Sequence, residues 1–210
     1  FMPSFLAVML ASLLLIPTLG RDFFPSVDAG QIALHVRAPV GTRLEDSAAV
    51  FSQVQNRVRE LIPAGQVKSM VANIGLSSAP LNLVYNNSGT VGPHEGDILI
   101  TLQRDRSPTE DHVATLRREL PKSFPGFDFA FLPADITSQI LNFGSPAPIN
   151  IQVSGRNLAA NEAYAKKLLQ RIRAIPGLAD ARVQQSSRYP QIKVDIDRAR
   201  IAQYGLTQRD

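Results

Sequence analysis

The sequence predicts a mixed α+β fold: a ferredoxin-like βαββαβ unit, then part of a second βαβ unit. Three observations predict it. Segments with the two-residue period of strands and segments with the period of helices follow each other in the order β-α-β-β-α-β. The order then starts again after residue 148. Hydrophobic residues make up 44% of the 210 residues, which is enough for a buried core.

The first unit is expected to contain four strands. They are predicted at residues 31–38 (QIALHVRA), 66–74, 97–103 (DILITLQ) and 127–132. In the first strand apolar and polar residues alternate, so this strand should be buried on one face only. In the fourth strand Phe127, Phe129 and Phe131 share one side.

Two helices should connect these strands, and each begins with the pattern of a capping box. In this motif a hydroxyl side chain and a glutamate three residues later satisfy free backbone N–H groups. The first pair is Thr42 with Glu45, and the second is Ser107 with Glu110, with Pro108 at the first helical position. Apolar residues at helical spacing predict the buried faces, which are Leu44, Phe51, Val54, Val58 and Leu61 in the first helix and Val113, Leu116 and Leu120 in the second.

The second unit should begin with a strand at residues 149–154, after two prolines, Pro146 and Pro148. Either Asn157 or Asn161 would open the next helix. Further strands are predicted at 179–183 and 191–195, with a short helix over 197–204. These patterns divide the chain into residues 1–20, a first domain at 21–134, a linker at 135–148 and a second domain at 149–210.

The chain opens with sixteen uncharged residues, and its first charged residue is Arg21. A helix needs roughly 20 apolar residues to cross a membrane. The run therefore predicts the end of a transmembrane helix that stops near Pro17. A signal-peptide remnant and a buried core helix are alternatives, although no basic residue precedes the run as it would in a signal peptide.

Most catalytic and cofactor chemistry has no counterpart in the sequence. There is no cysteine, and His35, His94 and His112 lack the spacing of metal ligands. Phosphate-binding glycine loops and the GxSxG nucleophile motif are absent too. The 22 basic residues are spread along the chain without interleaved aromatics, which argues against nucleic-acid binding. We therefore expect neither an enzyme nor a bound cofactor or metal.

Three stretches carry a resemblance to one transporter family. They are RDFFPSVDAGQIALHVRAPVGTRLED after the apolar run, ADITSQILNFGSPAPINIQVSGRN in the middle, and RYPQIKVDIDRARIAQYGLT near the end. Their order and sequence resemble the second periplasmic loop of resistance-nodulation-division (RND) efflux pumps, of the multidrug or acriflavin-resistance type.

The resemblance implies a fragment of a bacterial inner-membrane pump. Residues 1–20 would end its seventh transmembrane helix and touch the lipid bilayer, and residues 21–210 would lie in the periplasm. Residues 21–134 would form a porter subdomain, 135–148 a hinge, and 149–210 part of the next subdomain before a docking insertion. Such pumps are homotrimers that export hydrophobic or amphiphilic compounds, driven by proton influx, with a periplasmic adaptor and an outer-membrane channel.

The resemblance also implies site residues. Those matching the substrate pocket are His35, Phe129, Phe131, Leu132, Arg182 and Gln184, those matching a switch loop are Ile74, Gly75 and Leu76, and Leu99 matches a deep-pocket position. For Phe129 and Phe131, packing in the core is an equal alternative. The sequence departs from the family's drug pumps at Ile74, Leu76 and Leu99, where those pumps have aromatic side chains. This departure puts the usual drug spectrum in doubt.

Two other functions compete with drug export. A metal-exporting member of the same superfamily would use methionine clusters as soft ligands. Only Met2, Met9 and Met70 occur, and two of them lie in the apolar run, which argues against it. The other alternative is a membrane-tethered interaction domain with no transport activity.

Overall fold

The computed structural model describes residues 2–13, 28–75, 90, 92–134, 145 and 147–185. Its elements are α1 (Met2–Leu13), β1 (Gln31–Arg37), α2 (Leu44–Leu61), β2 (Val67–Ile74), β3 (Glu95–Leu102), α4 (Thr109–Ser123), β4 (Asp128–Leu132) and α6 (Leu158–Arg173). Among these residues no helix is both long and apolar enough to span a membrane. The predicted elements at 191–195 and 197–204, and most of the predicted linker, lie outside the described residues.

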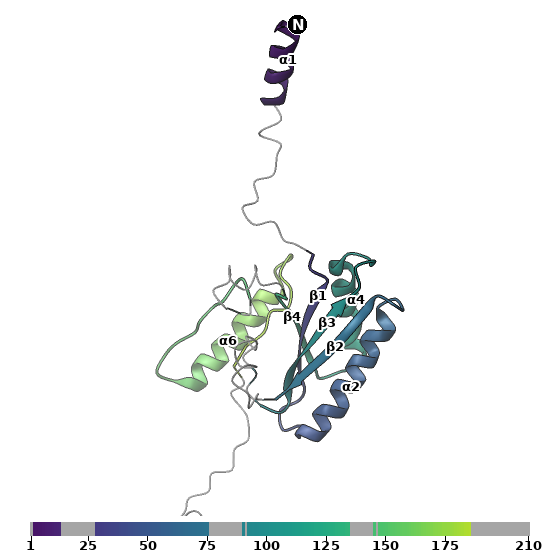
Figure 1. Ribbon diagram of the computed structural model, residues 1–210. Helices are drawn as coiled ribbons and strands as arrows, with labels where there is room; N and C mark the ends of the chain where they lie inside the picture. Colours follow the sequence, from purple (N-terminus) through teal and green to yellow (C-terminus); the bar gives the residue numbers. More distant parts are fainter. Residues whose placement is uncertain are drawn as a thin grey trace, which may run out of the picture.

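The four strands form one sheet in the order β2-β3-β1-β4, and every neighbouring pair is antiparallel. With α2 and α4 on one face, this is the predicted ferredoxin-like βαββαβ arrangement (Figure 1). The four predicted strands match the observed ones within two residues at either end. In Figure 1, α6 lies on the other side of the sheet from α2.

The core fills the space between the sheet and the two helices. It contains Ile32, Leu34, Val36, Phe51, Val54, Val58, Ile62, Ile98, Ile100, Leu102, Leu116 and Leu120. Helix α2 lies very close to β3, because a Cβ atom built on Gly96 would sit 2.9 Å from the Phe51 ring and 2.4 Å from the Asn73 carbonyl oxygen. Only glycine therefore fits at position 96.

Neither predicted capping box forms. The N-cap of α2 is Arg43, and the Thr42 hydroxyl instead donates to the Pro39 carbonyl at 2.7 Å. The N-cap of α4 is Pro108, which has no side-chain donor or acceptor. A carboxylate from outside the helix takes over this capping role.

That carboxylate belongs to Asp28, which precedes β1. It accepts from the Thr109 backbone N–H (3.0 Å), the Thr109 hydroxyl (2.5 Å) and Arg106 Nη2 (2.6 Å). The Thr109 hydroxyl bond, more than any other contact, holds the pKa of Asp28 well below its usual value. A negative charge at a helix N-terminus is also favoured by the helix dipole. Asp28 thus ties the start of β1 to the start of α4.

The second predicted unit is only partly observed. Asn157, the first of the two candidates, caps α6 by accepting from the Ala160 N–H at 3.0 Å. The segments 149–154 and 179–183, predicted as strands, are not strands in the structure. A strand needs a neighbouring strand for its backbone groups, and neither segment has one in the described part of the chain. Carbonyls of the second segment accept from arginine side chains instead.

Candidate functional site

The sheet face turned away from α2 and α4 carries ionisable side chains, and we call it the polar face. Successive residues of a strand point to opposite faces. Because Leu34 and Val36 enter the core, His35 and Arg37 of β1 lie on the polar face. The register places Asp97 opposite His35 and Glu95 opposite Arg37 on β3. On the polar face, the imidazole of His35 and the guanidinium of Arg37 thus lie against two carboxylates.

His35 and Asp97 form a buried pair at the centre of this face. His35 Nδ1 lies 2.8 Å from Asp97 Oδ1, and only 1% of His35 is exposed. His35 Nε2 is buried as well and has no hydrogen-bond partner in the described structure. Burying a ring nitrogen without a hydrogen-bond partner costs free energy. His35 Nε2 is therefore suited to contact a ligand. The prediction of a strand buried on one face only is therefore wrong for β1.

The second pair lies one register step further along the same strands. Arg37 Nε lies 2.6 Å from Glu95 Oε1, and Glu95 is fully buried. The other two guanidinium nitrogens of Arg37 donate to the carbonyls of Val183 at 2.9 Å and Gln184 at 2.7 Å. His94, also buried, has Nε2 3.5 Å from Glu95 Oε1, and its pKa is lowered chiefly by burial.

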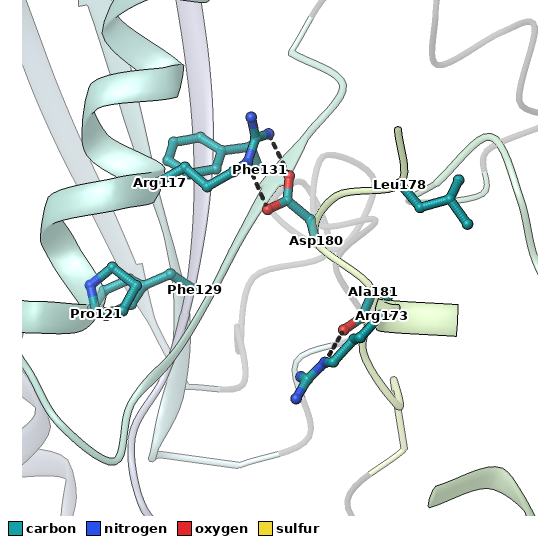
Figure 2. Close-up of a pocket in the computed structure, with 8 residues that line it drawn as sticks. All are labelled: Arg117, Pro121, Phe129, Phe131, Arg173, Leu178, Asp180 and Ala181. Atoms are coloured by element: carbon teal, nitrogen blue, oxygen red, sulfur yellow. Dashed lines mark hydrogen bonds and ion pairs between the residues drawn. The ribbon is translucent and has the colours of Figure 1, made fainter. Parts of the chain in front are cut away.

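Residues 180–184 lie against this end of the sheet, and we call them the strap. Arg117 of α4 forms two hydrogen bonds to the Asp180 carboxylate, at 3.0 and 2.6 Å (Figure 2). These bonds raise the pKa of Arg117. Within the strap, burial lowers the pKa of Arg182, and the nearby charge of Arg37 lowers it further.

A small pocket of about 220 Å³ lies between α4, β4 and the strap. Its lining residues are Arg117, Pro121, Phe129, Phe131, Arg173, Leu178, Asp180 and Ala181 (Figure 2). The Arg117 guanidinium carbon lies 5.1 Å from the centre of the Phe131 ring, within range of a cation–π contact. Phe129 and Phe131 also pack against the core, as the alternative reading of these side chains expected, and a role in binding a substrate stays a prediction.

The predicted site residues do not form one pocket. The register of β1, β3 and β4 puts His35, Leu99 and Leu132 on the polar face. Phe129 and Phe131 lie opposite Val36 and Leu34, on the core side of the edge strand. Arg182 and Gln184 belong to the strap, near Arg37 and away from the rings.

The predicted switch loop is described only at its start. Ile74 ends β2 and packs against the core, while the Gly75 N–H donates to the Glu95 carbonyl at 2.8 Å. Gly75 has a φ of 73°, which favours glycine. Leu76 lies outside the described residues.

Five residues of these contacts were not predicted from the sequence, namely Arg37, Glu95, Asp97, Arg117 and Asp180. A signal for the polar face was available, since a basic or imidazole group at 35 and 37 and an acid at 95 and 97 share the two-residue period of strands. The Arg117–Asp180 contact had no such signal, because it joins elements 63 residues apart. Within the described ranges no three His, Asp or Glu side chains are grouped so that they could hold a metal ion.

The sequence profile of the AcrB/AcrD/AcrF family, the RND permeases, matches residues 1–210. The chain belongs to this family. The predicted resemblance to RND efflux pumps is thereby confirmed.

Several curated relatives of the chain have names that refer to metals or cations. The chain is 24% identical to the cobalt-zinc-cadmium resistance protein CzcA of Cupriavidus metallidurans over 91% of its length. It is 27% identical to the nickel and cobalt resistance protein CnrA of the same species and to the cation efflux system protein CusA of Escherichia coli K12, again over 91% of its length. The chain spans only 17 to 18% of the length of these relatives.

A solved structure gives the same fold. A crystal structure of a heavy metal efflux pump superposes with a TM-score of 0.67 at 22% identity, covering 96% of this chain and 20% of that one. At this identity the likeness supports the α+β porter fold and carries no argument about the substrate.

Proposed function

We propose that the chain is a periplasmic part of an inner-membrane RND pump that exports divalent metal cations. The observation that carries the proposal is the buried His35–Asp97 pair on the polar face, with one imidazole nitrogen left for a ligand. The names of the relatives CzcA and CnrA, which refer to cobalt, zinc, cadmium and nickel, support the same substrate class, and the name of CusA refers to cations. The proposal reverses the order of our expectations, since metal export was the alternative and drug export the main one.

The donor atoms favour borderline cations such as Zn²⁺, Co²⁺ and Ni²⁺. Imidazole and carboxylate groups suit these ions, whereas thiolates and thioethers select Cu(I). The chain has no cysteine, and Met70 lies opposite Ile100 of the core. The absence of a methionine cluster therefore argues against soft cations only, and the expectation drawn from it was too broad.

Two donors are too few for a closed structural site, which uses four ligands. A transported ion, however, must be released again, and weak binding helps conduction through a pathway. We infer that His35 and Asp97 bind the cation transiently during transport, with water completing its coordination. Proton influx, a homotrimer, a periplasmic adaptor and an outer-membrane channel remain proposals for the whole pump.

Export of hydrophobic compounds is the second candidate, and the pocket at Phe129 and Phe131 favours it. The size of the pocket argues against it, because sites for drug-sized ligands occupy about 300–1,000 Å³ and this one holds about 220 Å³. Leu99, at the predicted deep-pocket position, lies on the other face of the sheet and has no aromatic ring.

Resistance measurements on the full-length pump distinguish the two. The pump would be expressed in a host that lacks its own metal and drug exporters, and growth would be followed with Zn²⁺, Co²⁺, Ni²⁺, Cu⁺ and amphiphilic dyes. We expect higher tolerance of the first three ions, and its loss in His35→Ala at equal protein level. Tolerance of dyes alone would contradict the proposal.

A further inference from the structure

We propose that Asp97 is a positioning residue that sets the tautomer of His35, so that His35 Nε2 offers a lone pair to a ligand. The class of ligand that follows is a metal cation, and anions and other hydrogen-bond acceptors are disfavoured. The assignment of that cation as a transported ion rests on the proposed function. The tautomer itself is measured on the pump without any metal.

One edge of the His35 ring is occupied by a carboxylate. His35 Nδ1 lies 2.8 Å from Asp97 Oδ1, which is hydrogen-bond distance. An ionised carboxylate only accepts hydrogen bonds, so the proton between the two groups lies on Nδ1. A neutral imidazole carries a proton on only one of its two nitrogens. His35 Nε2 is therefore the nitrogen with the lone pair.

The pairing of β1 with β3 holds the two groups together. His35 and Asp97 are directly opposed in the antiparallel register, so their side chains lie next to each other on one face of the sheet. Only 1% of His35 and 9% of Asp97 is exposed. Water therefore competes little for the hydrogen bond, and burial strengthens the attraction between the N–H group and the carboxylate.

The other neighbours of His35 on this face are alanines. Ala130 of β4 is directly opposite His35, and Ala33 precedes it by two residues in β1, so both share its face. Both are buried, and an alanine side chain can neither donate nor accept a hydrogen bond. His35 Nε2 accordingly has no hydrogen-bond partner in the described part of the chain. A polar residue at position 33 or 130 could have occupied this nitrogen or favoured the other tautomer.

The tautomer decides which ligands suit His35. A neutral imidazole binds a metal ion through the nitrogen without a proton, and the hydrogen bond of the other nitrogen sets which one that is. Histidine ligands usually donate this second N–H to a carboxylate or a carbonyl. His35 and Asp97 have this arrangement before any ion is bound. With its proton on Nε2, His35 would instead present an N–H group and suit an anion.

Nitrogen NMR of the full-length pump, labelled with ¹⁵N-histidine in metal-free membranes, would identify the tautomer. Subtracting the spectrum of His35→Asn, whose amide can still donate to Asp97, isolates the His35 signals. If that variant does not accumulate, His35→Gln takes its place. Asp97→Asn tests the carboxylate, because an amide can donate as well as accept. Asp128→Asn, at an exposed position of β4 opposite Arg37, is the matched control.

We expect the Nδ1–H form of His35 to outnumber the Nε2–H form by at least about tenfold in the parent, as for one hydrogen bond to a charged acceptor. In Asp97→Asn the two forms should come within about threefold of each other, since an amide satisfies either. Asp97→Glu, which keeps a carboxylate, and Asp128→Asn should retain the parent tautomer. Added Zn²⁺ should shift the Nε2 signal of the parent, and Asp97→Asn should weaken this binding by about 10–100-fold.

A parent pump in which His35 carries a proton on Nε2 would overturn the inference. An unchanged tautomer in Asp97→Asn would also overturn it, because another group would then orient the ring. Both results are obtained without metal. A fixed Nδ1–H tautomer whose Nε2 signal does not respond to Zn²⁺, Co²⁺ or Ni²⁺ would leave the role of Asp97 standing and refute only the proposed function.

Discussion

The two faces of the sheet are stabilised in different ways, although the same strands build both. On the core face, Leu34 and Val36 pack against α2 and α4 with no polar atom to satisfy. On the polar face, His35 is also buried and Arg37 is largely buried, but both lie against carboxylates. The difference teaches that burial alone does not identify a core. A buried charged side chain needs an oppositely charged partner, and a ligand or a moving segment can compete for that partner.

The largest effect is expected on the core face. Phe51→Ala should lower the free energy of unfolding of the chain by about 3–5 kcal/mol, because it leaves a cavity against the close-packed Gly96. Urea denaturation followed by circular dichroism measures this. A loss below about 1 kcal/mol would contradict a tightly packed core face.

The second-largest effect on the free energy of unfolding is expected on the polar face. Glu95→Gln should lower the free energy of unfolding by about 3 kcal/mol, because it leaves the Arg37 charge buried without its carboxylate. Replacing both partners, Arg37→Met with Glu95→Leu, should cost clearly less than the single change, since no buried charge remains. Equal losses in the two variants would show that shape, not charge, matters at this position.

A smaller effect is expected at the Asp28 clamp. Asp28→Asn should lower the free energy of unfolding by about 1 kcal/mol, the usual worth of a helix cap. The folded-state pKa of Asp28 is lowered, chiefly by the Thr109 hydroxyl, so its stabilisation is present above the ordinary aspartate pKa and lost as the pH falls through the folded-state pKa. Below about pH 4, the parent chain should therefore lose stability faster than Asp28→Asn. Thermal melts from pH 7 to 2.5 check this, and parallel curves would rule out the clamp.

The smallest effect is expected on the polar face away from the charged pairs. Val71 is 54% exposed and opposite Leu99, which is 45% exposed. Val71→Thr should change the free energy of unfolding by no more than about 0.5 kcal/mol. A larger loss, measured by the same urea titration, would mean that this part of the face is covered and that the contrast between the faces is incomplete.

The sequence predicted the first unit well because its signals were local. Alternation marked the four strands, and the spacing of Phe51, Val54 and Val58 marked the buried side of α2. The capping boxes failed for a tertiary reason, since Asp28, 81 residues before Thr109, supplied the cap of α4. The segment 179–183 has the pattern of a strand but not the partner. Its carbonyls are taken by Arg37 and Arg173, and local periodicity cannot show that.

The candidate site was harder to predict from the sequence than the fold. His35 was predicted from the family resemblance, but its partner Asp97 follows only from the pairing of β1 with β3. Phe129 and Phe131 were expected in the same pocket as His35. Strand alternation, once the register is known, sends them to the opposite face. The assignment of one site therefore needed the register of three strands, which the sequence alone did not give.

Transport by two matched variants of the full-length pump tests the central claim most directly, namely that the polar face and not the aromatic pocket contacts the substrate. Zn²⁺ uptake into inverted vesicles would be compared for His35→Ala and for Phe129→Ala with Phe131→Ala, at equal amounts of folded pump. We predict that His35→Ala lowers uptake by about tenfold or more and that the aromatic double variant stays within about twofold of the parent. Loss of uptake in the aromatic variant with normal uptake in His35→Ala would contradict the account.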